Sequence, residues 1–137
     1  MYDPKVVQPM REELTKLGIQ ELRTAAEVDE VLGKEKDTVL VVVNSVCGCA
    51  AGGCRPGVGK ALQHGKKPSK LTTVFAGQDK EATDKARSYF VGFPPSSPAI
   101  ALMKNGQVAH IMHRHDIEGK SADQIAAVLT EAFDKFC

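Results

Sequence analysis

The stretch Val39-Leu40-Val41-Val42-Val43-Asn44-Ser45-Val46-Cys47-Gly48-Cys49 decides the fold of this chain. Its first part, residues 39–43, is apolar without alternation, which is the pattern of a strand covered on both faces. Two cysteines follow, and the residues after them can begin a helix. Backbone N–H groups and the helix dipole at such a strand-to-helix turn stabilise a thiolate. Because the thiolate is the nucleophile of disulfide exchange, the stretch predicts redox chemistry.

Apolar periodicity predicts that helices and strands alternate on both sides of this stretch. We expect a first helix with Pro9 in its first turn and Gly18 at its end. Asn105-Gly106, between two apolar runs, indicates a β-hairpin, and Ser121 begins a capping box. The remaining predicted elements are strands near 19–22 and 71–76, hairpin strands near 99–103 and 107–112, and helices near 25–32, 58–65, 82–90 and 122–136.

The predicted order is therefore α, β, α, β, α, β, α, β-hairpin, α. Alternating strands and helices imply parallel pairing with right-handed crossovers, and the hairpin adds an antiparallel edge. This α/β order is that of a thioredoxin-like three-layer sandwich with one extra N-terminal helix. No repeat or linker divides residues 1–137, so we expect a single domain.

Charge and hydropathy exclude several classes of function. The chain has 18 Lys and Arg residues and 17 Asp and Glu residues. This balance provides no excess of positive charge for binding nucleic acid or anionic lipid. The first twenty residues carry many charges, and no stretch is long and apolar enough for a signal peptide or a membrane span. We therefore expect a cytoplasmic protein that does not bind nucleic acid or membrane.

The four cysteines are Cys47, Cys49, Cys54 and Cys137. Three of them lie within eight positions. Disulfides within this cluster could not cross-link distant segments of the chain, as structural disulfides do. In a reducing compartment such clusters indicate catalysis, redox sensing or metal binding. Inert burial suits Cys54 or Cys137 better than the glycine-spaced pair.

Several segments together resemble the bacilliredoxin family. They are residues 44–52 with Arg55-Pro56, residues 95–98, residues 114–119 and the ending at 136–137. The resemblance covers nearly the whole chain and implies an enzyme that removes bacillithiol from mixed disulfides on proteins. Bacillithiol, or another low-molecular-weight thiol, would be the co-substrate, S-thiolated client proteins the partners, and no cofactor would be tightly bound.

The resemblance also implies roles for individual residues. Cys47 would be the nucleophile and Cys49 the resolving thiol, while Gly48 gives the backbone between them conformational freedom. Arg55 could add positive charge near Cys47 if its side chain turns back. We expect Gly48 and Arg55 to contact the substrate together with the Ser97-Pro98 loop. Ser97-Pro98 matches the cis-proline loop of the fold, where the backbone of the residue before the proline pairs with an extended substrate.

Some alternatives remain open from the sequence. Cys54 stands where the family pattern leads us to expect a non-thiol residue, and it is either a second resolver or a bystander. His110, His113 and His115 beside thiolates suggest zinc, but surface histidines are the simpler account, and we assign no metal ligand. Protein disulfide isomerase activity, a metal or iron–sulfur carrier and a redox sensor without turnover are the alternative functions.

Overall fold

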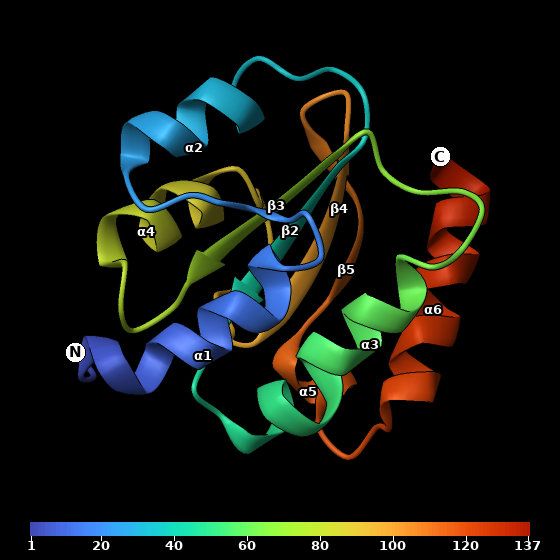
Figure 1. The fold of residues 1–137 in the computed structure, drawn as a ribbon. Helices are drawn as coiled ribbons and strands as arrows, with labels where there is room; N and C mark the ends of the chain where they lie inside the picture. Colours follow the sequence, from blue (N-terminus) through green and yellow to red (C-terminus); the bar gives the residue numbers. More distant parts are fainter.

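A five-stranded mixed sheet runs through the centre of the molecule, in the order β1-β3-β2-β4-β5 (Figure 1). The computed structural model describes residues 1–137. β2 lies in the middle of the sheet, parallel to β3 and antiparallel to β4, and β4 pairs antiparallel with β5. The strands are β1 (Gln20–Glu21), β2 (Val39–Asn44), β3 (Lys70–Phe75), β4 (Ala99–Lys104) and β5 (Gln107–Met112).

Helices cover both faces of the sheet and complete the predicted thioredoxin-like three-layer sandwich (Figure 1). One face packs against α1, α3 and α6, and the other against α2 and α4. None of these helices has the length and hydropathy that a membrane crossing requires. The helices are α1 (Pro4–Thr15), α2 (Ala25–Leu32), η1 (Ala50–Cys54, a π-helix), α3 (Arg55–Ala61), α4 (Lys80–Ser88), α5 (Arg114–Ile117) and α6 (Ala122–Phe136).

β2 supplies side chains to both halves of the core. Leu40 and Val42 pack with α3 and α6, while Val39, Val41 and Val43 pack with α2 and α4. All six residues of the strand are buried. This explains the uninterrupted apolar run in the sequence, because a strand covered on both faces has no solvent side for polar residues.

The close approach of α3 to α6 depends on glycine. A Cβ atom at Gly57 would lie 2.7 Å from Cγ2 of Ile125, and one at Gly53 would lie 2.9 Å from Cδ1 of the same residue. Any side chain at these positions would push the two helices apart. The glycines therefore set the spacing of the layer that carries the end of the cysteine turn.

The N-terminal helix begins earlier than predicted. Asp3 caps it by accepting a hydrogen bond from the backbone N–H of Lys5, and Pro4 occupies its first position. Pro9, which we placed in the first turn, instead lies inside the helix. The prediction of the helix start was wrong because an Asp-Pro pair is itself a strong start signal.

Candidate functional site

The cysteine pair lies on the turn that leaves the C-terminal end of β2. Cys47 and Cys49 are half-buried, Gly48 between them is exposed, and the chain then winds into η1. The Sγ atoms of Cys47 and Cys49 are 2.7 Å apart and form a hydrogen bond in which either sulfur can donate. The turn thus presents two thiols in direct contact at the protein surface.

The two thiols have opposite electrostatic environments. The pKa of Cys47 is lowered, first by the hydrogen bond from the Cys49 side chain, then by the backbone N–H of Cys49, the positive charge of Arg114 and the backbone N–H of Ala50. Burial and the neighbouring Cys47 raise the pKa of Cys49 to about 11. Of the two thiols, Cys47 therefore loses its proton more readily, and Cys49 keeps its proton and donates it to the Cys47 sulfur.

Arg114 is the cation of the site, and the sequence reasoning did not select it. The residue begins the short helix α5, directly after the hairpin. Its backbone N–H donates to Oγ of Ser96 (3.2 Å), and its guanidinium donates to the carbonyl of Ser97 (3.4 Å) and to the Glu118 carboxylate. The only signal for Arg114 in the sequence was its place in the 114–119 segment that resembles the family.

The proline loop lies on the same side of the molecule as the cysteines. The Ser97–Pro98 peptide bond is cis, as the resemblance implies. Arg114 hydrogen-bonds this loop, and its charge acts on both Cys47 and Cys49. The structure therefore brings Ser97 and Pro98 to the cysteine turn through the start of α5.

Arg55 lies underneath the cysteine turn rather than on its surface. Its side chain is 2% exposed and donates to the carbonyl of Ser45 (2.8 Å) and to Oδ1 of Asn44 (3.0 Å). Its Nε lies 3.2 Å from a carboxylate oxygen of Glu13. The expectation that Arg55 contacts substrate does not agree with this burial, and the charge beside Cys47 comes from Arg114 instead.

The hydrogen bonds of Arg55 continue to the nucleophile candidate. Asn44 Oδ1 also accepts from the backbone N–H of Ser45 (2.9 Å), and Ser45 Oγ accepts from the backbone N–H of Cys47 (3.1 Å). A buried cation at the start of this chain of bonds fixes the turn from inside the protein. Arg55 is thus placed to position Cys47.

Cys54 and Cys137 lie outside the thiol pair. Cys54 is fully buried in the core between the sheet and α6, and burial raises its pKa to about 12. A thiol with this pKa is protonated at neutral pH and cannot act as a nucleophile without leaving the core. Of the two roles considered for Cys54, the structure favours the bystander. Cys137 is exposed at the end of α6.

The histidines do not gather around the thiolates. The rings of His113 and His115 stack on each other at 5.5 Å between centroids, and His110 lies partly buried on β5. No group of three or more His, Cys, Asp or Glu side chains is placed to hold a metal ion. The His113 and His115 rings therefore contact each other, while His110 lies apart from them on β5.

Comparison with known proteins gives a consistent family. Residues 2–137 match the family model described as "Disulphide isomerase". A bacilliredoxin of Koribacter versatilis is 56% identical over 137 residues, which is 100% of this chain and 94% of that protein. A bacilliredoxin of Geobacillus kaustophilus is 53% identical, over 99% of this chain and 94% of its own length.

Solved structures resemble the chain in fold. The thioredoxin-like domain of Arabidopsis NCP superposes with a TM-score of 0.61 at 20% identity, over 85% of this chain and 77% of that chain. Mitochondrial thioredoxin 3 of Saccharomyces cerevisiae gives a TM-score of 0.55 at 17% identity, over 86% and 95% of the two chains. At such identities the likeness concerns the fold alone.

Proposed function

The chain belongs to the bacilliredoxin family and is a thiol–disulfide oxidoreductase, and from this premise we propose that it removes bacillithiol from mixed disulfides on client proteins. Its site of action in this proposal is the cytoplasm. Cys47 is the nucleophile and Cys49 the resolving thiol. The observation that supports these assignments is the division of charge within the pair, with the pKa of Cys47 lowered and that of Cys49 raised.

The first step transfers bacillithiol to the enzyme. The Cys47 thiolate attacks the bacillithiol sulfur of the mixed disulfide, and a Cys47–bacillithiol disulfide forms as the client–bacillithiol disulfide breaks. The client cysteine leaves as a thiolate and takes a proton from solvent. One disulfide replaces another, so the step needs no outside oxidant or reductant.

The second step releases the small thiol. Cys49 loses its proton and attacks the Cys47 sulfur, a Cys47–Cys49 disulfide forms, and bacillithiol leaves as a thiolate. The two electrons that reduce the original mixed disulfide come from this cysteine pair. Once Cys47 carries bacillithiol its negative charge is gone, which removes one of the causes that raise the pKa of Cys49. Transfer of bacillithiol to Cys47 thus lowers the pKa of Cys49, the resolving thiol.

The proline loop and the glycine of the motif serve substrate binding in this proposal. Gly48 is exposed and leaves the turn between the two thiols open to solvent. The backbone of Ser97, ahead of the cis-proline, pairs with the client segment that carries the mixed disulfide. Pro98 keeps that segment beside the cysteines.

Intact mass spectrometry of Cys49→Ser tests the proposal. The variant also carries Cys137→Ser, which removes the exposed terminal thiol. Cys54 is left unchanged because it is buried. After mixing with a bacillithiolated client, this variant is expected to gain one bacillithiol as the client loses one. A matched Cys47→Ser, Cys137→Ser variant should gain none. Absence of transfer to the Cys49→Ser variant, while its Cys47 still reacts with iodoacetamide, would overturn the proposal.

Disulfide isomerase activity is a second candidate, because the matched family model carries that description. Isomerisation begins with the same attack by the Cys47 thiolate but returns the enzyme unchanged. We therefore expect Cys49→Ser to keep the ability to reactivate a client with scrambled disulfides. Failure of the wild type to reactivate this client, with transfer of bacillithiol intact, would separate the two activities and reject the isomerase.

A further inference from the structure

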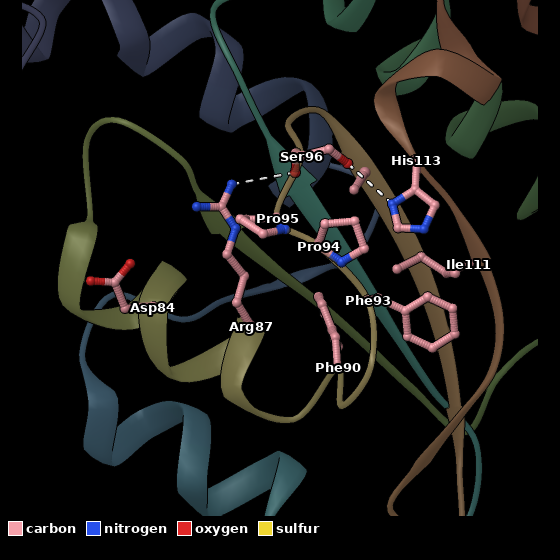
Figure 2. A pocket seen from close by; sticks show the side chains of 10 residues that line it. Asp84, Arg87, Phe90, Phe93, Pro94, Pro95, Ser96, Ile111 and His113 are labelled. Atoms are coloured by element: carbon pink, nitrogen blue, oxygen red, sulfur yellow. Dashed lines mark hydrogen bonds between the residues drawn. The ribbon is translucent and has the colours of Figure 1, made fainter.

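A surface pocket of about 280 Å³ lies between α4 and the end of β5, beside the proline loop (Figure 2). Arg87 of α4 lies on one side of it, and Phe93 and His113 lie on the other. Ser96 lies between them and contacts both sides: its carbonyl accepts from the Arg87 guanidinium (3.3 Å), and its Oγ lies 3.4 Å from Nδ1 of His113. The volume is close to the lower end of the range for small-molecule sites.

Arg87 differs from every other arginine of the protein in having no carboxylate partner. Arg11, Arg23, Arg55 and Arg114 all lie within ion-pair distance of an Asp or Glu. Arg87 makes one hydrogen bond, to the Ser96 carbonyl, and its Nε is buried without a partner. A half-buried guanidinium with most of its five donors unused favours an anion at this place.

The acidic residue on the pocket wall does not fill this role. Asp84 lies one helical turn before Arg87 on α4, and Lys80 binds its carboxylate at 2.6 Å. Lys80 thus offsets the charge of Asp84, and Arg87 remains the unpaired cation of the pocket. The fork of a guanidinium matches a carboxylate, which can accept two parallel hydrogen bonds from it.

The pocket is joined to the reactive thiols through a single loop. Ser96 lines the pocket, and its Oγ also accepts from the backbone N–H of Arg114, whose charge acts on Cys47. The proline loop therefore contacts both the pocket and the cation whose charge acts on Cys47.

We propose that this pocket binds a carboxylate of the low-molecular-weight thiol, with Arg87 as the specificity-determining residue. The inference rests on the proposed function, because the thiol is the group that Cys47 removes. Phe93 and His113 provide the opposite wall, and their rings lie 5.8 Å apart. The site would favour thiols that carry carboxylates over neutral thiols of the same size.

The test compares two mixed disulfides on one client peptide that has blocked ends and no acidic residue. One carries bacillithiol, and the other carries bacillithiol with its carboxylates converted to methyl esters. We expect the wild type to prefer the free acid by roughly tenfold in kcat/KM, the usual effect of a charge-assisted pair. Arg87→Gln should abolish this preference, and Arg87→Lys should retain part of it. Lys85→Gln, which removes a charge from α4 outside the pocket, should retain all of it.

A third peptide distinguishes the source of the carboxylate. It carries the esterified thiol and one aspartate near the thiolated cysteine. If Arg87→Gln slows only this peptide, the anion belongs to the client and the inference is wrong. If the wild type transfers both adducts at equal rates, or if the preference survives in Arg87→Gln, the inference is also overturned.

A binding measurement separates this inference from the proposed function. S-methyl bacillithiol cannot exchange disulfides, and its binding should shift the Nε–H resonance of Arg87 in NMR spectra. The esterified compound should leave this resonance in place. A wild type that transfers neither adduct but shows this shift would reject the proposed function and keep the pocket, whereas absence of the shift rejects the pocket.

Discussion

The guanidinium of Arg55 donates a hydrogen bond to the carbonyl oxygen of Ser45 from inside the protein, two residues before Cys47. This places a buried positive charge behind the reactive turn. Its carboxylate partner, Glu13, is 41% exposed, so the desolvation of Arg55 is compensated mainly by the oxygens of Ser45 and Asn44. The turn and the arginine therefore depend on each other for stability.

Replacing this arginine should loosen the turn. We expect Arg55→Gln to lower the free energy of unfolding by about 2–3 kcal/mol, because hydrogen bonds to a buried charge are lost. Arg55→Lys keeps the charge but lacks the planar guanidinium and its several N–H donors. It should lower the free energy of unfolding by nearly as much. Urea titration measures both. A loss equal to that of an exposed control, Arg23→Gln, would contradict the role of Arg55.

The reactivity of Cys47 should depend on Arg114. Because the pKa of Cys47 is lowered, its alkylation by iodoacetamide should rise with pH at a lower midpoint than the alkylation of an ordinary exposed thiol. Arg114→Gln removes a positive charge, so the midpoint should move to higher pH and the rate at neutral pH should fall about two- to threefold, since the charge is exposed and screened. Arg114→Lys is the matched control and should retain most of the rate.

The buried thiol of Cys54 should make stability fall at alkaline pH. Its pKa is about 12 in the folded protein and about 8.5 in an unfolded chain. Between these values the unfolded state loses the proton and the folded state keeps it. The free energy of unfolding therefore decreases as pH rises, by at most about 1.4 kcal/mol per unit from this group.

Cys54→Ala isolates this contribution. Near neutral pH the variant should be about 1 kcal/mol less stable than the wild type, because of the small cavity it leaves. From about pH 8 to about pH 10 this difference should shrink and then reverse, since alanine has no proton to lose. Chemical denaturation at several pH values measures it, and a difference that does not change with pH would refute the assignment.

The two glycines of α3 should respond in opposite ways to alanine. Gly57→Ala places a methyl group 2.7 Å from Ile125, and we expect a loss of about 1–3 kcal/mol from overpacking. Gly59→Ala, in the same helix, meets only Leu17 at an ordinary 3.5 Å and should gain about 0.5–1 kcal/mol of helix propensity. Thermal unfolding of the two variants compares them. Similar changes in both would show that α3 does not pack on α6 as described.

Local signals in the sequence were sufficient for most of the fold. The apolar run at 39–43, the Asn105-Gly106 turn and the Ser121 capping box each predict an element that the structure contains. The π-helix and the short helix α5 were not predicted. A π-turn has no apolar period of its own, and a four-residue helix is too short to show one.

The site was predictable to the extent that its residues are neighbours in sequence. The Cys-Gly-Cys turn is local, and its chemistry follows from its position after a strand. Arg114 and Arg87 could not be found in this way, because only the folded chain brings Arg114 close to the cysteine turn and Arg87 to the proline loop. Arg55 was correctly linked to the motif, but the sequence could not show that its side chain turns inward.

The π-helix η1 separates Cys49 from Arg55, and the position of Arg55 depends on how many residues this helix contains. In any helix each added residue rotates the residues that follow it about the axis, so one residue more or fewer in η1 would turn Arg55 away from Asn44 and Ser45. Gly52 has open space around it and can accept a side chain. The segment therefore tolerates substitution at Gly52 but not insertion or deletion. The number of residues in η1 keeps the Arg55 side chain under the cysteine turn.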